Sequence, residues 1–293
     1  MGKTEIAIAL AAEIGAEIVS ADSMQVYRGL PIATNQPTAE QLAAVPHHLV
    51  GVIDPRDEFS AWRYAELADD AISAVRGRGR RVIVAGGSGL YLRAALGGLT
   101  FGGPPNAALR VELEALGARD PEALSERLRR VDPQAWAAVD LANPRRVVRA
   151  LEAAEARAPA DGPDRGVERD ELWAPGAARH ETRLFCLDVD RAGLRERVGH
   201  RVDDMARRGL LAEVAALPQP LSRTVAQAIG VREMLAVLGG QESLEAALER
   251  MKARTRSYVR RQLTWMRKLN ADIIPTSARP PESVARELMQ RLS

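Results

Sequence analysis

Met1-Gly2-Lys3-Thr4-Glu5, followed by an apolar run over residues 6–14, opens the chain. Gly-Lys-Thr at the start of a helix is the second half of the phosphate-binding loop G-x-x-x-x-G-K-[ST]. The first helical turn presents free amides and a positive dipole end to a phosphate, Lys3 adds a charge, and Thr4 offers a hydroxyl to a metal ion. Taken alone, the tripeptide is also compatible with an ordinary helix start. Its meaning therefore depends on the residues that follow.

The sequence as it stands has no strand before this loop. A parallel sheet without its central strand would leave backbone hydrogen-bonding groups unpaired. We therefore expect translation to begin upstream of Met1. The alternative is that Met1 is the true start.

Two further segments place polar groups at one edge of the predicted sheet. Residues 17–20 form a short strand that is followed by Asp22, and residues 81–85 form a buried strand that runs into Gly86-Gly87-Ser88-Gly89. In open α/β folds, ligands bind at the edge where the carboxyl ends of the strands lie. A glycine loop, a carboxylate and a second glycine turn together predict a phosphate pocket with a base beside it. Nucleotide kinases share this layout, so finer detail must define the chemistry.

The remaining pattern predicts an α/β fold, a P-loop NTPase-like parallel sheet flanked by helices, with an all-helical insertion. Core helices are expected at residues 4–14, 38–45, 60–76, 191–208, 210–216, 226–238, 244–269 and 283–292. The chain is expected to return to the sheet at residues 184–189 and to add a last edge strand at residues 272–275. Residues 46–49 are expected to form a loop. The catalytic core comprises residues 1–100 and 181–293, and the insertion comprises residues 101–180.

Three helix starts of the same kind indicate the insertion: Asp120-Pro121, Asp132-Pro133 and Asn143-Pro144. In each, a side chain that can accept a hydrogen bond from the first turn precedes a proline at the first helical position. Residues 158–176 are rich in Pro, Gly, Asp and Arg, which predicts a mobile loop without periodic structure.

Composition narrows the class of protein. Of the 293 residues 46% are apolar and 27% are charged, as in globular chains. The one cysteine, Cys186, excludes a disulfide framework and a multi-cysteine zinc site, and its apolar neighbours predict a buried structural residue. His47 and His48 have no third ligand at metal-binding spacing, so we expect them to pack in a loop. The sequence has no run of about 18 apolar residues and no signal-peptide pattern, which predicts a cytoplasmic protein without a membrane partner.

Basic residues gather near the carboxyl end, although the net charge is only +2. Between residues 250 and 271 no acid occurs, and the basic residues are Arg250, Lys252, Arg254, Arg256, Arg260, Arg261, Arg267 and Lys268. A solvated helix face and a footprint for a phosphate backbone both explain such a run. The interleaved Tyr258 and Trp265 favour the nucleic-acid interpretation.

Five ordered blocks of sequence resemble the tRNA dimethylallyltransferases, also called tRNA isopentenyltransferases. The blocks are ADSMQVYRGL at residues 21–30, PHHL at residues 46–49 with Asp54-Pro55, GGSGLY at residues 86–91, NPRRVVRALE at residues 143–152, and RTRSYVRRQLTWMRK at residues 254–268. The resemblance covers nearly the whole chain in the expected order. The phosphate loop of the family begins Gly-Pro-Thr-x-x-Gly-Lys-Thr, and only its last part is present here.

The resemblance implies transfer of a dimethylallyl group from its diphosphate to N6 of an adenosine next to the tRNA anticodon. The diphosphate-binding residues that it implies are Gly2, Lys3, Thr4 and Ser88, with Mg²⁺ held by Thr4. Arg201 matches a family arginine that grips the diphosphate from the far side, although the sequence alone would make it a surface charge. Asp22 resembles the catalytic base that removes the N6 proton, and the alternative is a structural or metal-sphere carboxylate.

The tRNA contacts implied by the resemblance are spread over several segments. They are Asp22, Ser23, Met24, Gln25, Arg145, Arg146, Arg149, Gln227, Gly230, Arg232, Arg260 and Arg261. The residues that follow Asp22 would flank the target base, which must leave its stack to reach the pocket. The arginines at 145, 146 and 149 are equally compatible with a solvated helix face. Val231 stands where the family usually has tyrosine, which leaves no ring or hydroxyl for a contact at this position.

Three other functions remain open. A related class of enzymes prenylates free adenine nucleotides and shares Thr34-Asn35 and Val45-Pro46-His47-His48, whereas the insertion and the basic segment favour a large RNA. A small-molecule P-loop kinase would bind ATP and leave the arginine-rich end unexplained. A catalytically inactive RNA-binding protein is expected only if Met1 is the true start. We expect a monomer whose partners are a tRNA anticodon stem-loop, dimethylallyl diphosphate and Mg²⁺.

Overall fold

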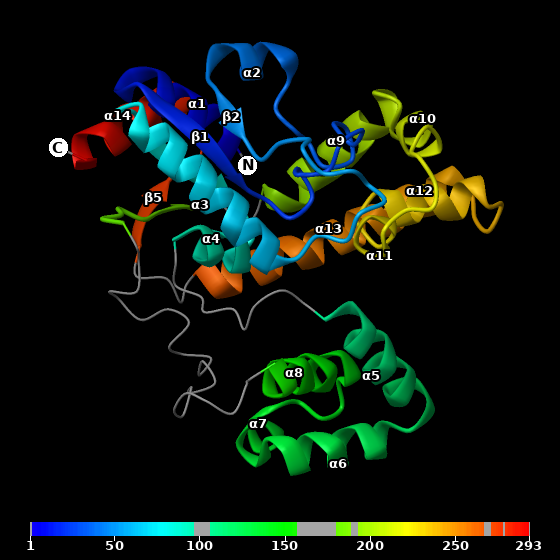
Figure 1. The fold of residues 1–293 in the computed structure, drawn as a ribbon. Helices are drawn as coiled ribbons and strands as arrows, with labels where there is room; N and C mark the ends of the chain where they lie inside the picture. The colour runs from blue at the N-terminus through cyan, green and yellow to red at the C-terminus, as the bar shows by residue number, and fades with distance from the viewer. Residues whose placement is uncertain are drawn as a thin grey trace. The chain divides into compact units, whose positions relative to one another are not determined.

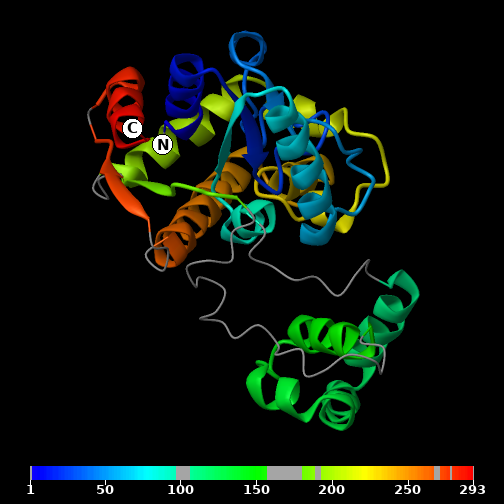
Figure 2. The same cartoon turned by 60° about the vertical axis from the view of Figure 1, so that its left-hand side comes forward.

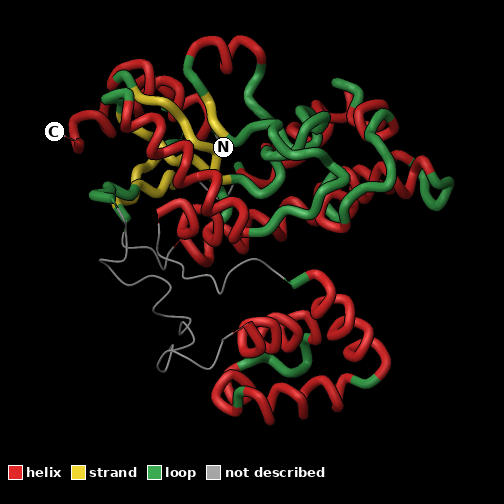
Figure 3. Tube along the Cα trace, in the orientation of Figure 1, coloured by secondary structure: helices red, strands yellow, loops and turns green. Residues whose placement is uncertain are grey.

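A computed structural model describes residues 2–96, 106–156, 180–188, 193–266, 271–277 and 279–292 (Figure 1). Contacts divide the chain into two compact units, one formed by Met1–Gly98 with Pro175–Ser293 and the other by Leu99–Ala174. The first unit carries all the described strands, and the described residues of the second unit form helices and their connections (Figure 3).

Three parallel strands form the main sheet of the first unit. The central strand is β1 (Ala16–Ala21), which lies between β2 (His47–His48) and β3 (Arg81–Gly86). Every residue of β1 is buried, as expected for a parallel strand that is covered on both faces. The prediction of a loop over residues 46–49 is wrong at β2, because the backbone of β2 pairs with β1.

A second parallel sheet is formed by β4 (Phe185–Asp188) and β5 (Asp272–Pro275). The prediction that residues 184–189 return to the main sheet is therefore wrong, because among the described strands β4 pairs with β5 and not with β3. The outer edges of β3 and β4 have no strand partner in the described part of the chain. Most of β3 is accordingly only half-buried, unlike β1.

Helices surround the two sheets. Those of the first unit are α1 (Lys3–Ile14), α2 (Ala39–Ala44), α3 (Ala61–Gly77), α4 (Gly89–Leu96), α9 (Leu194–Arg207), α10 (Leu210–Ala215), α11 (Arg223–Ala226), α12 (Val231–Leu238), α13 (Leu244–Met266) and α14 (Pro281–Leu292). Helix α1 packs on α14 and on the main sheet, and α3 packs on α4. The long helix α13 contacts α4, α9 and α12 (Figure 2). Among the described helices, none has the length and apolar character needed to cross a membrane.

The single helix predicted over residues 226–238 is interrupted. Helix α11 ends at Ala226, and α12 begins only at Val231. Gly230 between them has a φ of 94°, a left-handed conformation that glycine adopts without strain and that a helix does not contain. The short connection therefore turns the chain between two helices.

Apolar packing fixes the position of α1. Ile6 and Leu10 pack against Val284 and Leu288 of α14, and Ala11 packs against Ile18 of β1 through a neighbouring cluster. Burying one such branched side chain contributes about 1.5–3 kcal/mol. The amino-terminal turn of α1 is thereby held near the carboxyl end of β1.

The second unit consists of α5 (Ala107–Arg119), α6 (Pro121–Val131), α7 (Pro133–Ala138) and α8 (Pro144–Ala156). Two helix starts have the predicted caps: Asp120 Oδ1 accepts from the amide of Ala123 at 2.9 Å, and Asp132 Oδ1 accepts from the amide of Ala135 at 2.8 Å. Its core contains Leu113, Leu124, Leu128 and Leu151. The loop predicted over residues 158–176 lies outside the described residues.

Candidate active site

The amino-terminal turn of α1 forms one wall of a pocket of about 570 Å³. Gly2 precedes the helix with a φ of 63°, and its carbonyl oxygen accepts from the amide of Ile6 at 3.0 Å. Lys3 and Thr4 line the pocket. Burial lowers the pKa of the Lys3 ammonium, while the charge of Asp22 acts in the opposite direction. The turn thus offers amides, a cation and a hydroxyl to an anionic group.

The carboxyl end of β1 delivers Asp22 to the same pocket. Its Oδ1 accepts from the amides of Met24 at 2.9 Å and Gln25 at 3.3 Å, so the turn after the strand fixes this oxygen. None of the described residues makes a hydrogen bond to Oδ2. Asp22 is therefore a carboxylate that is held at one oxygen and can act on a ligand with the other.

A second cation reaches the pocket from α9. Arg201 lines it, and its charge contributes to the lowered pKa of Lys3. Burial lowers the pKa of Arg201 as well, and the carboxylates of Asp22 and Glu5 act against this effect. Because Lys3 and Arg201 repel each other, an anion bound in this pocket would reduce that repulsion. The charges of the site therefore favour a polyanionic ligand such as a diphosphate.

One face of α13 closes the pocket. Thr255, Tyr258 and Gln262 recur at the spacing of a single helix face and line it. Burial raises the pKa of Tyr258 to about 12, so its phenol remains protonated at neutral pH. The Nε2 of buried Gln262 donates to the carbonyl oxygen of Gly87 at 2.7 Å, which ties α13 to the turn after β3.

Exposed side chains of α13 carry part of the predicted basic footprint. Arg260 and Arg261 are exposed, and the guanidinium of Arg261 lies 5.9 Å from the centre of the Tyr258 ring. Other basic residues of the segment pair with acids elsewhere in the sequence: Arg250 with Glu242, Lys252 with Asp203 and Glu249, and Arg254 with Glu233. Arg256 is half-buried on α13, and Arg267 and Lys268 lie outside the described residues. The described part of the footprint is therefore smaller than the sequence predicts.

The pocket gathers most of the site residues predicted from the sequence. Those that line it are Gly2, Lys3, Thr4, Asp22, Ser23, Met24, Gln25, Arg201, Gln227 and Arg261. Four predicted residues of the same unit do not line it, namely Ser88, Gly230, Arg232 and Arg260. Arg145, Arg146 and Arg149 are exposed on α8 of the helical unit, where Arg146 also pairs with Asp140.

The loop over residues 30–37 forms a further wall that sequence reasoning missed. The side-chain amide of Gln25 binds this loop, because its Nε2 donates to the carbonyl oxygen of Asn35 at 2.8 Å. Glu213 of α10 accepts from the amides of Ile32 at 2.7 Å and Ala33 at 2.8 Å. Gln25 is thus engaged by the protein itself, in addition to its predicted contact with a base.

The inner face of α13 was also missed, although a signal for it exists in the sequence. Thr255, Tyr258 and Gln262 fall on one side of a helix whose opposite side carries Arg256 and Arg260, while Arg261 lies at the margin between the two sides. That two-sided pattern is typical of a helix that forms a wall on one face and meets solvent or a polyanion on the other.

The pocket contains oxygen ligands that suit Mg²⁺. The hydroxyl of Thr4 and the carboxylate of Asp22 both line it, and hard oxygen donors are the ligands that Mg²⁺ prefers. No cluster of three or more His, Cys, Asp or Glu side chains that could hold a metal occurs in the described part of the chain. A magnesium ion here would therefore complete its coordination with water and substrate oxygens.

The two histidines have contacts within the main sheet. His48 Nε2 lies 2.7 Å from Glu17 Oε2, and His47 Nδ1 lies 2.7 Å from the carbonyl oxygen of Val45. His48 thereby fastens β2 to the start of β1. This differs from the loop packing expected from the sequence, because β2 is part of the sheet.

Fold and site together define a class of protein. A parallel α/β fold that presents a Gly-Lys-Thr helix start, two cations and a carboxylate at the strand ends is typical of enzymes with a P-loop-like fold.

Comparison with known proteins identifies a family within this class. Residues 25–269 match the family described as IPP transferase. The chain is 42% identical to the tRNA dimethylallyltransferase of Anaeromyxobacter dehalogenans strain 2CP-C, over 99% of this chain and 96% of that protein. It is also 42% identical to the tRNA dimethylallyltransferase of Thermomicrobium roseum, over 92% and 81% of the two chains.

Solved structures agree with this assignment. The full-length tRNA isopentenylpyrophosphate transferase from Bacillus halodurans has 33% identity and a TM-score of 0.70, over 99% of this chain and 91% of that one. A eukaryotic dimethylallyltransferase described as acting on tRNA has 26% identity and a TM-score of 0.77, over 99% and 74%. The chain therefore belongs to the IPP transferase family, which confirms the resemblance found in its sequence.

Proposed function

We propose that this protein transfers a dimethylallyl group from dimethylallyl diphosphate to N6 of an adenosine next to the anticodon of a tRNA, and releases diphosphate. The observation that carries the proposal is a single pocket that combines Lys3, Arg201 and the α1 amino terminus with Asp22. Its relatives named as tRNA dimethylallyltransferases support the choice of substrates.

The cationic side of the pocket would stabilise the leaving group, diphosphate. Amides at Gly2, the ammonium of Lys3 and the guanidinium of Arg201 can neutralise the charge that develops on diphosphate as its bond to carbon breaks. Thr4 would hold Mg²⁺, with Asp22 as a further oxygen ligand or as the base. When bound, Mg²⁺ would add positive charge beside the diphosphate oxygens.

The carboxylate of Asp22 would activate the nucleophile, N6 of adenine. The N6 lone pair of adenine is delocalised into the ring, so N6 is a poor nucleophile until its proton is removed. Asp22 would accept that proton while the N6–carbon bond forms and the carbon–oxygen bond to diphosphate breaks. The hydrogen bonds from Met24 and Gln25 to Oδ1 support this role, because they orient the carboxylate without occupying Oδ2.

The RNA would reach the pocket past several described segments. Ser23, Met24, Gln25 and Gln227 line the pocket and would contact the unstacked base, and the exposed Arg260 and Arg261 would contact phosphates. Arg145, Arg146, Arg149, Gly230 and Arg232 complete the proposed RNA contacts, and Ser88 would assist at the diphosphate. We further propose that the protein acts as a monomer in the cytoplasm, where tRNA is available.

Replacement of Asp22 by asparagine tests the proposal. Wild type and Asp22→Asn would be incubated with dimethylallyl diphosphate, Mg²⁺ and an anticodon stem-loop, and the RNA mass measured. We expect the RNA to gain one dimethylallyl group with wild type, and the variant to lose at least about 10²-fold in turnover while it still binds the stem-loop. Asp70→Asn, at an exposed acid of α3, is the matched control.

The same assay separates the alternatives. Product on AMP but not on the stem-loop would favour an adenylate prenyltransferase. Phosphoryl transfer from ATP without any prenylated product would favour a kinase. RNA binding without either product would indicate an inactive RNA-binding protein. Unchanged turnover of Asp22→Asn would remove Asp22 from the role of base.

A further inference from the structure

The loop over residues 30–37 forms one wall of the candidate active site and contains no charged residue. Thr34 and Asn35 of this loop line the pocket, whereas its two cations, Lys3 and Arg201, come from α1 and α9. Neutral hydroxyl and amide groups can pair with the edge of a base, and they add no positive charge for a diphosphate. The loop therefore matches the adenine side of the proposed reaction.

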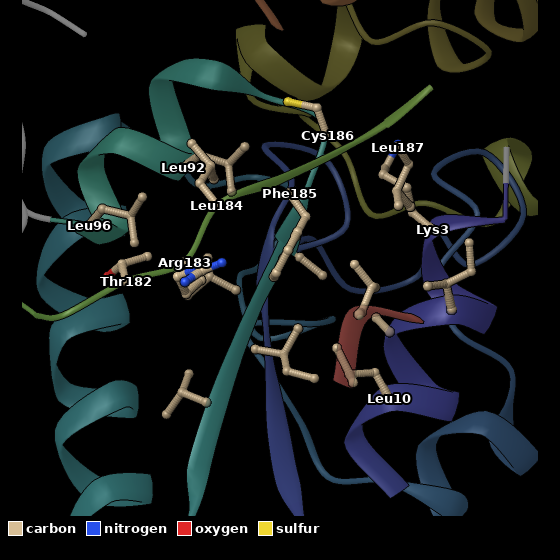
Figure 4. A pocket seen from close by; sticks show the side chains of 18 of the residues that line it. Lys3, Leu10, Leu92, Leu96, Thr182, Arg183, Leu184, Phe185, Cys186 and Leu187 are labelled. Carbon is tan, nitrogen blue, oxygen red and sulfur yellow. The ribbon is translucent and has the colours of Figure 1, made fainter. Parts of the chain in front are cut away.

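The diphosphate side of the pocket is built without this loop. Lys3 also lines a second cavity, of about 670 Å³, together with residues of β3 and β4 (Figure 4). Neither the loop nor α10 lines that second cavity. Lys3 and the loop are therefore held in place by separate elements of the first unit.

The loop is folded as a tight turn that holds one residue in an uncommon conformation. The amide of Thr34 donates to the carbonyl oxygen of Leu30 at 3.1 Å, and the amide of Asn35 donates to that of Ile32 at 3.1 Å. Asn35 has a φ of 52°, in the left-handed region that residues other than glycine seldom adopt. Such a conformation persists only where the surrounding contacts determine it.

Glu213 of α10 caps the start of this turn from a distant part of the chain. Its Oε2 accepts from the amide of Ile32 at 2.7 Å, and its Oε1 accepts from the amide of Ala33 at 2.8 Å. Amides in the first turn of a helix favour a carboxylate partner in the same way. Burial raises the pKa of Glu213, while the two amides and the charge of Arg208 act against this effect. A carboxylate can accept from both amides at once, which a neutral amide side chain cannot do.

The other end of the loop is tied to the turn that carries Asp22. Gln36 Nε2 donates to the carbonyl oxygen of Gln25 at 2.9 Å, and Gln25 Nε2 donates to that of Asn35 at 2.8 Å. The backbone amide of Gln25 also donates to Asp22 Oδ1. A continuous chain of hydrogen bonds and backbone thus runs from Glu213 through the loop to the carboxylate proposed as the base.

We propose that Glu213 is a positioning residue for the adenine side of the reaction: it fixes the loop over residues 30–37, and the loop forms the wall against which the unstacked base lies. The inference rests on the proposed function, because the base is the ligand that the loop would receive. Glu213 does not line the pocket, so it acts through the loop and not on a substrate.

Replacement of Glu213 by glutamine tests this role. Glutamine has the same shape but one acceptor oxygen, so one loop amide loses its partner and faces an N–H donor. Turnover would be measured against stem-loop concentration and then against dimethylallyl diphosphate concentration. We expect kcat/KM for the stem-loop to fall at least about tenfold, and KM for dimethylallyl diphosphate to stay within about twofold. Glu282→Gln, at an exposed acid of α14, is the matched control and should change neither value.

A stem-loop that lacks the target base separates positioning from a general loss of folded protein. Wild type should bind the intact stem-loop more tightly than the abasic one, because only the first offers a base to the pocket. We expect Glu213→Gln to bind the abasic stem-loop as wild type does and to bind the intact one about tenfold more weakly. An equal loss for both RNAs, or an unchanged preference for the intact one, would overturn the inference.

Replacement of Gln36 by alanine keeps the inference testable if Glu213→Gln does not fold. Gln36 holds the other end of the same loop and does not line the pocket. We expect the same split between the two substrates, and wild-type kinetics of Gln36→Ala would reject the role of the loop. If wild type forms no prenylated RNA, the proposed function fails and this inference fails with it. Product from wild type without a split in the variants would reject this inference alone.

Discussion

Gln262 of α13 donates a hydrogen bond from Nε2 to the carbonyl oxygen of Gly87 over 2.7 Å. The bond is buried and joins two segments that are 175 residues apart in the sequence. A Cβ atom at Gly87 would lie 3.5 Å from the Lys3 Nζ, so this turn also adjoins the cationic end of the pocket. The helix that presents Arg260 and Arg261 to solvent is thereby fixed to the turn beside Lys3.

Replacement of Gln262 by alanine should destabilise the protein by about 1–3 kcal/mol, because the buried carbonyl of Gly87 would lose its partner. Urea unfolding would measure the loss, and titration with inorganic diphosphate would show whether the turn beside Lys3 has shifted. Thr264→Ala is the control on the same helix, since the Thr264 hydroxyl is exposed and bonds only within α13. Equal stability of both variants would show that the bond to Gly87 contributes little.

Replacement of Gly87 by alanine should be destabilising through the same contact. The added Cβ would lie 2.2 Å from Gln262 Nε2, closer than any packing allows. In the double variant Gly87→Ala with Gln262→Ala, the clash is absent, so the two destabilisations should fall short of additivity by about 0.5–3 kcal/mol. A double-mutant cycle by urea unfolding measures this coupling. Strict additivity would show that the two residues do not act through each other.

Replacement of Glu17 by glutamine should weaken stability at neutral pH and flatten its acid dependence. Burial alone would raise the pKa of Glu17, yet hydrogen bonds from His48 and Arg78 outweigh it and leave the pKa lowered. The unfolded state therefore binds the proton more readily than the folded state. The stability contributed by Glu17 is complete above the unfolded pKa of about 4.3 and is lost as pH falls through the lower folded value.

Thermal unfolding between neutral pH and the acid range would measure this effect. We expect Glu17→Gln to cost about 1–3 kcal/mol at pH 7, a moderate value because Arg78 and His48 keep access to water. Glu66→Gln removes an exposed acid that pairs with Arg63 and should leave both stability and its pH profile near wild type. A wild-type acid profile for Glu17→Gln would contradict the assignment.

Charge reversal at Arg260 and Arg261 should weaken binding of an anticodon stem-loop and reduce its salt dependence. Each lost phosphate contact lowers the slope of log affinity against log salt by about 0.7–0.9. The matched control is reversal of Arg286 and Arg291, which are exposed on α14 and do not line the pocket. Binding titrations at several salt concentrations provide the slopes. An unaltered slope in the α13 variant would identify this surface as an ordinary solvated helix face.

The elements that the sequence predicts correctly are those fixed by interactions between residues close together in the chain. The start of α6 follows from an aspartate before a proline, and Asp120 makes the expected bond to the amide of Ala123. The start of α1 and the delivery of Asp22 to its side likewise follow from short motifs that need no distant partner. Such elements are specified by neighbours within a few residues.

Features that depend on distant partners could not be predicted. The chain breaks between α11 and α12 where Gly230 donates to Glu233, and Glu233 is in turn paired with Arg254 of α13. β2 forms because its two residues pair with β1, and β4 pairs with β5, a segment near the carboxyl end of the chain. The two-sided pattern of α13 is visible in the sequence, but its contact with the turn after β3 depends on the bond between Gln262 and Gly87. Tertiary contacts decide each of these cases.

The outer edge of β3 also has a consequence for how the protein behaves in solution. A strand edge that is not covered is a template on which strands of other molecules can add, and natural proteins usually cover such edges or place charges along them. Only Arg81 at the start of β3 is charged, and the rest of this strand is apolar or glycine. Among the described strands this edge of β3 has no partner, so light scattering at rising protein concentration tests the proposed monomer: a constant mean particle size agrees with it, and a size that grows would show association through such an edge.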